Sequence, residues 1–282
     1  MEPLLLAKDL APGDRALAHA EWGDVAVHRV RGAVDPDFTP AYQRLWAAFG
    51  ARGEMERRVV IEERIAWDPA RPTGASALAY ELLVVRRDGE IAALRDHTAV
   101  VRLDGDGRPL PGPVVVHLSH AFVEPPHRGS GLAGWLRALP LQAARRCAAA
   151  AGASPEAAIV LVAEMEPLDP AEPGRGVRLR SYERAGFLKV DPEAAPYSQP
   201  DFRPAEEWPA GVPEALRLGL VLRRVGREDE REMPADELAA VVDAVYSVYG
   251  VHVPAVALDP LRADAMRWCA RRARFPLLPP TR

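Results

Sequence analysis

Residues 123–133 read Val-Glu-Pro-Pro-His-Arg-Gly-Ser-Gly-Leu-Ala and join the end of a predicted β-strand to the start of a helix through a tight loop. Gly129 and Gly131 remove side chains where backbone N–H groups must point into a common space, and the start of the helix adds partial positive charge. Arg128 contributes a fixed charge at the same place, which suits a pyrophosphate better than a carboxylate. The loop therefore predicts an anion-binding cradle.

The segments on either side of this loop predict a parallel pair of strands. Residues 114–123 form the strand that enters the loop, and an apolar helix follows over about residues 130–150. Pro140 should kink this helix, because proline removes one backbone hydrogen bond. Residues 157–163 are a continuous apolar run, typical of a strand buried on both faces. Strand, long helix and strand in this order form a βαβ unit, whose strands are parallel.

An antiparallel sheet is expected before this unit. Asp88-Gly89 separates two β-rich runs, residues 81–87 and 91–103, and supplies the positive φ angles of a tight hairpin turn. Further elements are expected from hydrophobic periodicity. They are a strand over 25–30, a helix from Tyr42 to about residue 58, a helix over 177–185, strands over 187–190 and 216–225, and helices over 234–249 and 259–274. The order predicts an α/β protein with a mixed sheet.

Composition excludes several classes of function. The chain has 282 residues with 36 Lys+Arg against 40 Asp+Glu, so it lacks the cationic excess of a nucleic-acid-binding protein. No apolar run approaches the roughly 20 residues of a membrane span, and the first residues lack a signal-peptide pattern. Cys147 and Cys269 stand outside any disulfide or zinc-binding spacing, which favours a reducing compartment and no bound metal. We therefore expect a cytoplasmic protein without a membrane or nucleic-acid partner.

Two motifs in this order resemble those of a known superfamily. Arg128, Gly131 and Ala133 fill the spacing Arg-x-x-Gly-x-Ala, which resembles the acetyl-coenzyme A signature of the GCN5-related N-acetyltransferase (GNAT) superfamily. About fifty residues later, Tyr182-Glu-Arg-Ala-Gly-Phe187 looks like the tyrosine-bearing helix of that superfamily. The resemblance covers roughly residues 20–226. It implies an acyl-coenzyme A N-acyltransferase fold with three parts, an N-terminal segment (1–20), an acetyltransferase domain (21–226), and a charged linker with a C-terminal helical extension (227–282).

The resemblance also implies acetyl-coenzyme A as co-substrate. The strand over 114–123 should splay from the strand over 157–163 and admit the pantetheine arm, which pairs with backbone groups near Phe122 and Val123. The pyrophosphate should then lie against the loop residues Arg128, Gly129, Ser130, Gly131, Leu132 and Ala133.

Acyl transfer to an amine needs a base for the amine and a proton for the leaving thiolate. The resemblance implies Tyr182 as the proton donor. His120 is our first choice of base, because a neutral imidazole is available near pH 7. Glu124 and Glu164 remain alternatives. Alternation places His117 on the opposite face of the strand from His120 unless a β-bulge intervenes.

The sequence thus predicts an N-acetyltransferase that moves an acetyl group to a primary amine by direct attack in a ternary complex, without a covalent enzyme intermediate. The alternatives are a non-catalytic acyl-coenzyme A-binding or regulatory module and a protein that binds another phosphate ligand. The acceptor is open, although the slight excess of carboxylates favours a cation. An apolar face in the C-terminal segment must be covered by the domain or by a second subunit in a homodimer. It consists of Leu238, Val241, Val242, Val245 and Val248.

Overall fold

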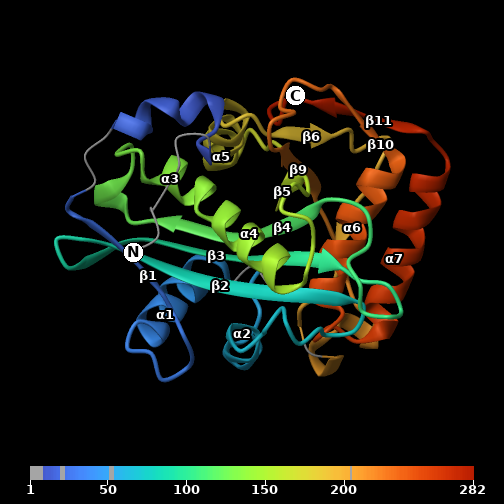
Figure 1. Cartoon of the computed structure of the whole chain (residues 1–282), viewed down its shortest axis with the longest axis horizontal. Helices are drawn as coiled ribbons and strands as arrows, with labels where there is room; N and C mark the ends of the chain where they lie inside the picture. The colour runs from blue at the N-terminus through green and yellow to red at the C-terminus, as the bar shows by residue number, and fades with distance from the viewer. Residues whose placement is uncertain (1–8, 20–22, 51–53, 204) are drawn as a thin grey trace.

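Nine strands form a sheet at the centre of the protein (Figure 1). The sheet is mixed, as the sequence predicted. The computed structural model describes residues 9–19, 23–50, 54–203 and 205–282. The strands of this sheet are β1 (Val25–Arg29), β2 (Ser76–Arg87), β3 (Glu90–Arg102), β4 (Val114–Val123), β5 (Ile159–Met165), β6 (Leu188–Val190), β9 (Gly219–Arg224), β10 (Glu232–Pro234) and β11 (Arg274–Leu278). Their order across the sheet is β1-β2-β3-β4-β5-β9-β6-β11-β10. β4 and β5 pair in parallel, as expected, and the other pairs are antiparallel.

The β2–β3 hairpin confirms the turn read from the sequence. Asp88 and Gly89 have φ angles of 52° and 83°, which a two-residue turn between twisted strands requires. β1 pairs with the outer edge of β2, and β4 pairs with β3. These four strands are the antiparallel half of the sheet, and β4 passes from it directly into the glycine loop.

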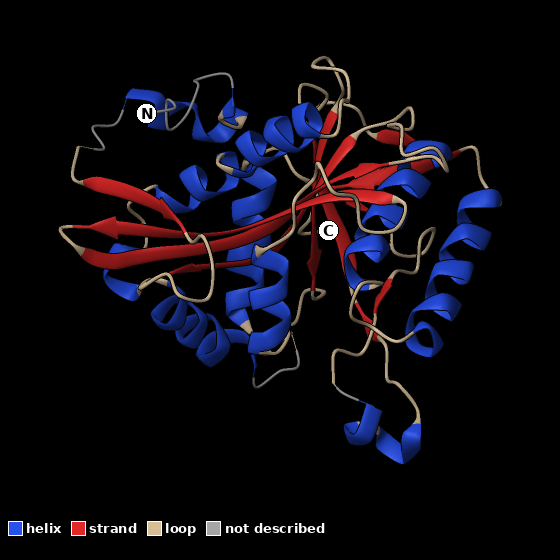
Figure 2. Cartoon of the chain, turned by 60° about the horizontal axis from the view of Figure 1, so that its bottom comes forward, coloured by secondary structure: helices blue, strands red, loops and turns tan. Residues whose placement is uncertain are grey.

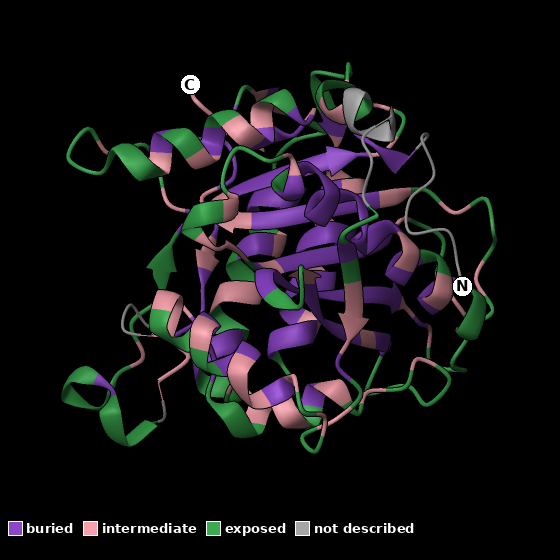
Figure 3. Ribbon diagram, turned by 90° about the vertical axis from the view of Figure 1, so that its left-hand side faces the viewer, coloured by how far each residue is buried: buried purple, intermediate pink, exposed green. Residues whose placement is uncertain are grey.

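Helices cover both faces of the sheet (Figures 1 and 2). One face carries α3 (Leu132–Ala138), α4 (Pro140–Ala150) and α5 (Pro173–Arg184). The other carries α1 (Phe38–Phe49), α2 (Arg58–Ile65), α6 (Ala235–Tyr249) and α7 (Ala255–Ala270). The predicted long helix is broken into α3 and α4 at Pro140, as the missing backbone donor requires. The central strands are buried on both sides, and exposed residues gather on the outer helix surfaces and loops (Figure 3).

Residues 227–282 continue the same sheet. β11 pairs with β6, and β10 pairs with β11. The apolar face of α6 packs into the largest cluster of buried side chains, together with residues of β4, β5 and β9. The chain therefore covers this face itself, which removes the reason for expecting a homodimer through it. The charged linker is an ion-pair network as well as a solvated turn, because the buried Arg224 contacts Glu230 and Glu237.

Several elements differ from the prediction. α1 ends at Phe49, and a separate helix, α2, follows it. The expected strand over 216–225 is divided into β8 (Leu216–Arg217) and β9, and β8 pairs with β7 (Ser198–Gln199) in a small second sheet. Short 3-10 helices occur at Pro12–His19, Pro125–His127, Ala205–Glu207 and Pro209–Gly211. Among the described residues, we find no helix whose length and apolar character would let it cross a membrane.

Candidate active site

The sheet opens in its middle, between β4 and β5. These strands pair from Val114 with Ile159 to His117 with Val162, and beyond that point the described register contains no further pair. β4 nevertheless continues to Val123 and β5 continues to Met165. Because β3 and β9 hold the outer edges of the two strands, the divergence leaves a gap inside the sheet. This is the splay that the resemblance implied.

A β-bulge in β4 lies at the start of this gap. Asp96 of β3 pairs with His120, and Thr98 pairs with His117, so three steps along β4 match two steps along β3. The extra residue reverses the alternation of side chains. His117 and His120 consequently line the same cavity, although strict alternation would place them on opposite faces.

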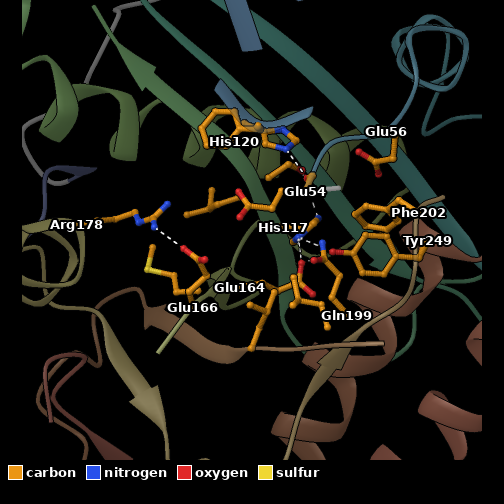
Figure 4. Close-up of a pocket in the computed structure, with 16 residues that line it drawn as sticks. Glu54, Glu56, His117, His120, Glu164, Glu166, Arg178, Gln199, Phe202 and Tyr249 are labelled. Carbon is orange, nitrogen blue, oxygen red and sulfur yellow. Dashed lines mark hydrogen bonds and ion pairs between the residues drawn. The ribbon is translucent and has the colours of Figure 1, made fainter. Parts of the chain in front are cut away.

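Two adjoining cavities meet at the splay. The first, which we call the acidic cavity, is lined by the glutamates Glu54, Glu56, Glu164 and Glu166, by both histidines, and by Phe202 and Tyr249 (Figure 4). The second, the basic cavity, is lined by Arg95, Arg137, Tyr182, Val123 and Ala133. The residues that line both are Phe49, Leu118, Ser119, Glu164, Met165 and Arg178. A molecule in one cavity could therefore reach a molecule in the other across this shared rim.

His120 is held as a cation. Its Nδ1 lies 3.0 Å from a carboxylate oxygen of Asp96, and its Nε2 lies 2.9 Å from the carbonyl oxygen of Glu54. Burial opposes the charge, but the Asp96 carboxylate outweighs it and raises the pKa of His120 to about 9. Both ring nitrogens therefore carry protons near neutral pH and donate them to fixed acceptors. This geometry argues against the sequence-based expectation that His120 is the general base.

His117 and Glu164 form a second buried pair, at the shared rim. Nε2 of His117 lies 2.9 Å from Glu164, whose carboxylate also accepts hydrogen bonds from the hydroxyls of Tyr197 and Tyr249. Burial, followed by the charge of Glu164, raises the pKa of both phenols well above the usual range, so they remain donors. Figure 4 shows His117, Glu164 and Tyr249 converging on one point. A carboxylate on Nε2 fixes the tautomer whose Nδ1 accepts a proton.

Nδ1 of His117 faces the hydroxyl of Ser119 at 3.5 Å. Because Ser119 lines both cavities, this hydroxyl can connect the imidazole with a group bound at the rim.

Tyr249 belongs to the C-terminal segment, and nothing in its local sequence distinguishes it from the other residues of an amphipathic helix. Of the aromatic residues between β6 and β9, Phe202 lines the acidic cavity, whereas the indole of Trp208 donates to the Arg203 carbonyl.

Tyr182 lines the basic cavity from the last turn of α5. Gly186 follows this helix with φ of 78°, and the N–H of Phe187 returns to the carbonyl of Tyr182. This capping turn brings the Phe187 ring edge-on to the Tyr182 ring, with 4.8 Å between the centroids. Arg137 lies over the same ring at 5.7 Å. The phenol is thus 9% exposed and fixed in orientation.

The glycine loop has the backbone geometry of a cradle. Gly129 and Gly131 adopt φ angles of 78° and 91°, which side chains other than glycine rarely allow. Nε of Arg128 donates to the carbonyl of Val123 and ties the loop to the end of β4. Leu132 and Ala133 begin α3, where the first N–H groups of a helix have no acceptor within it.

The remaining predicted residues lie around this loop. Ser130 closes the turn by a hydrogen bond from its hydroxyl to the carbonyl of His127. Phe122 packs against the side chains beneath α1, on the face away from α3. Glu124, one of the alternative bases, forms an ion pair with Arg44 at 3.0 Å. Within the described residues, Glu124 lines neither cavity.

Comparison with known proteins finds no matching family model and no matching curated protein. Solved structures do resemble the chain. The structure of yncA from Salmonella typhimurium with acetyl-CoA shares 19% identity over 72% of this chain and 94% of that one, with a TM-score of 0.37. A GNAT family acetyltransferase from Elizabethkingia anophelis with acetyl-CoA bound shares 14% identity over 71% of this chain and 98% of that one, with a TM-score of 0.34. The ribosomal-protein-S18-alanine N-acetyltransferase from Escherichia coli shares 12% identity over 71% of this chain and 94% of that one, with a TM-score of 0.32. At such distances the function must be argued from the motifs and the site itself.

Proposed function

We propose that the protein is a GNAT-type N-acetyltransferase that transfers an acetyl group from acetyl-coenzyme A to a primary amine. The observation that carries this proposal is the pair of cavities that share a rim where β4 and β5 diverge. A donor bound in one and an acceptor bound in the other would meet at Ser119 and Glu164. Direct attack in a ternary complex requires this arrangement, because both substrates must be present together.

The basic cavity suits the coenzyme. The edge of β4 that faces the gap would pair with the pantetheine arm near Phe122 and Val123, and the cradle would hold the pyrophosphate. The cradle residues are Arg128, Gly129, Ser130, Gly131, Leu132 and Ala133. Positive φ at the two glycines and unused N–H groups at the start of α3 support this assignment.

The acidic cavity suits an amine. Four glutamates line it, of which Glu56 pairs with Arg64 and Glu166 pairs with Arg175 and Arg178. Glu164 has only hydroxyls and His117 as partners among the described residues. A protonated amine would be attracted to this wall and would have to lose a proton before attack. We assign that proton to His117, oriented by Glu164, in place of His120.

Tyr182 is the proposed proton donor to the leaving thiolate. Neither cysteine is suited to a covalent step, since burial raises the pKa of Cys147 to about 12 and that of Cys269 to about 11. Their reduced state also suits the proposed cytoplasmic location. In this proposal residues 21–226 bind the coenzyme, and residues 227–282 complete the acceptor side through Tyr249.

The first test is calorimetric titration of acetyl-coenzyme A into the purified protein, followed by an amine library with a free-thiol readout. We expect saturable binding and thiol release that depends on the amine. No heat of binding and no shift in unfolding temperature at high micromolar ligand would contradict the proposal.

The alternative is a non-catalytic acyl-coenzyme A-binding module. The side chain of Glu164, which is 5% exposed and has three hydrogen-bond partners within the chain, supports it, because a carboxylate satisfied in this way needs no ligand. Tyr182→Phe distinguishes the two functions. An enzyme loses turnover and keeps its affinity for the coenzyme, whereas a binding module has no turnover to lose.

A further inference from the structure

Arg95 is a buried cation that has no partner of opposite charge among the residues that the structure describes. It lies on β3 opposite Ala121 of β4, at the level of the splay, and its side chain lines the basic cavity. The residue is 1% exposed. Its Nε and Nη2 have no hydrogen-bond acceptor among the described residues, and its Nη1 lies 3.5 Å from the hydroxyl oxygen of Tyr182.

The other cations of this cavity are neutralised. Arg137 contacts the carboxylate of Asp14 at 3.0 Å, and Arg178 contacts Glu166 at 2.9 Å. Burying a charge without a partner is costly, and an apolar side chain of similar volume at this position would favour folding. The cost implies that the guanidinium meets a negative charge that the described part of the chain does not supply.

We propose that Arg95 stabilises the coenzyme A thiolate as it leaves. This inference rests on the proposed acetyl-transfer function. The amine nitrogen forms a bond to the carbonyl carbon of the thioester, the carbon–sulfur bond then breaks, and its electron pair remains on sulfur. The guanidinium offsets this charge until sulfur receives the proton of Tyr182. The proton that His117 took from the amine balances the one passed to sulfur, and Tyr182 is reprotonated at the end of the cycle.

The contact with Tyr182 supports this role. The guanidinium donates toward the phenolic oxygen, which leaves the phenolic hydrogen free to donate to a group in the cavity that both residues line. A donor and a cation are thus placed side by side where the thioester sulfur would lie. Preorganised charge in a site closed to water acts more strongly than it would at a surface.

The test is the pKa of the thiol of bound coenzyme A, measured from the ultraviolet absorbance of the thiolate. The charged groups that face this thiol are Arg95, Arg137, Arg178 and Glu164, with Tyr182 beside them. The thiol pKa of coenzyme A bound to the native protein should lie below that of free coenzyme A in the same buffer. Arg95→Gln should raise it by about one unit or more and lower kcat about 100-fold, with little change in KM.

Arg102→Gln is the matched control. Arg102 is also on β3, but it pairs with Asp243 and lines neither of the two cavities. The thiol should titrate in this variant as in the native protein. Equal thiol pKa values with Arg95→Gln and with the native protein would overturn the inference while leaving the acetyl-transfer function intact. Failure of the native protein to bind coenzyme A would instead overturn the proposed function and this inference with it.

Stability gives a second, independent readout through Arg95→Met. A structural arginine would lower the unfolding temperature when removed, whereas an uncompensated cation kept for the reaction should raise it. We expect a higher midpoint of thermal unfolding together with the loss in kcat. A lower midpoint with unchanged kcat would assign Arg95 to the fold and overturn the inference.

Discussion

The two cavities that meet at the splay of β4 and β5 have opposite charge. Glutamates line the acidic cavity, and arginines line the basic cavity. On both sides most of these charges are already paired within the chain, as Glu56 is with Arg64 and Arg137 is with Asp14. Two groups differ from these pairs of carboxylate and arginine within the described part of the chain. Glu164, on the shared rim, has His117 and two tyrosine hydroxyls as partners, and Arg95, in the basic cavity, has no carboxylate partner.

This difference distinguishes charged groups that shape the cavities from those that we propose to take part in the reaction. A buried ion pair can be exchanged for apolar side chains at little cost in stability, so its presence indicates shape more than function. Under the proposed function, the Glu164 carboxylate and the Arg95 guanidinium, neither of which has an oppositely charged arginine or carboxylate partner among the described residues, are the groups that meet the substrates. In the proposed function, the amine therefore lies in the acidic cavity and the anionic leaving group in the basic one.

Removing the charge of Glu164 in the acidic cavity should cause the largest loss of activity. With Glu164→Gln, the tautomer of His117 is no longer fixed by a carboxylate, and the amine loses its path to a base. We expect kcat/KM to fall by about 10³, within the usual range for general base catalysis. Steady-state thiol release with a reactive amine from the library measures it.

Glu166→Gln is the control for this variant. Glu166 lines the same cavity but pairs with Arg175 and Arg178. It should keep most of the activity, and both variants should bind acetyl-coenzyme A as the native protein does. Full activity in Glu164→Gln would show that the carboxylate beside His117 matters no more to the reaction than one paired with arginine.

The second-largest loss of activity should come from Tyr182→Phe, in the basic cavity. The thiolate would then leave without a nearby proton, although the charge of Arg95 remains. We expect kcat to fall about 100-fold with unchanged affinity for acetyl-coenzyme A, from stopped-assay kinetics and calorimetry. Tyr246→Phe removes a buried hydroxyl that donates to the Ser198 carbonyl, and it should leave kcat near the native value. Equal losses in both variants would point to destabilised packing in place of proton donation.

The buried ion pair of His120 and Asp96, by contrast, should affect the pH dependence of the free energy of unfolding. The folded pKa of His120, about 9, lies above its ordinary value of 6.5, so its stabilising contribution is complete below pH 6.5 and is lost as pH rises through 9. The free energy of unfolding should fall over this interval by up to about 1.4 kcal/mol per pH unit. Denaturant titrations at several pH values measure the slope.

His120→Gln should remove this pH dependence while making the protein less stable overall. His28→Gln, which changes a partly exposed histidine paired with Asp35, should retain it. A native protein whose stability is constant from pH 6.5 to 9 would show that His120 is neutral, and would restore it as a candidate base.

Local signals in the sequence predicted the elements that we propose to bind the coenzyme. Asp88-Gly89 fixed the hairpin turn and Pro140 the break between α3 and α4, because each acts on its own backbone. The bulge in β4 and the contact between Glu164 and Tyr249 depend on residues far apart in the chain, so no local pattern revealed them. β11 was missed because Pro276 cannot donate to a ladder and weakens the strand pattern. His120 was predicted to be the base because the sequence does not reveal its contact with Asp96.

The smallest effect should come from the cradle, where the chain contains its own control. Gly129 and Gly107 both have φ of 78°, and in each case an added Cβ would meet no atom within 4 Å. Replacement by alanine should therefore destabilise either position by about 1 kcal/mol, through the backbone alone. Only Gly129→Ala places a methyl group where the pyrophosphate should lie, so it alone should weaken acetyl-coenzyme A binding, by about tenfold or 1.4 kcal/mol. Calorimetry on both variants gives the two affinities. If they are equal, the anion lies elsewhere, and the positive φ of Gly129 serves only the turn between β4 and α3.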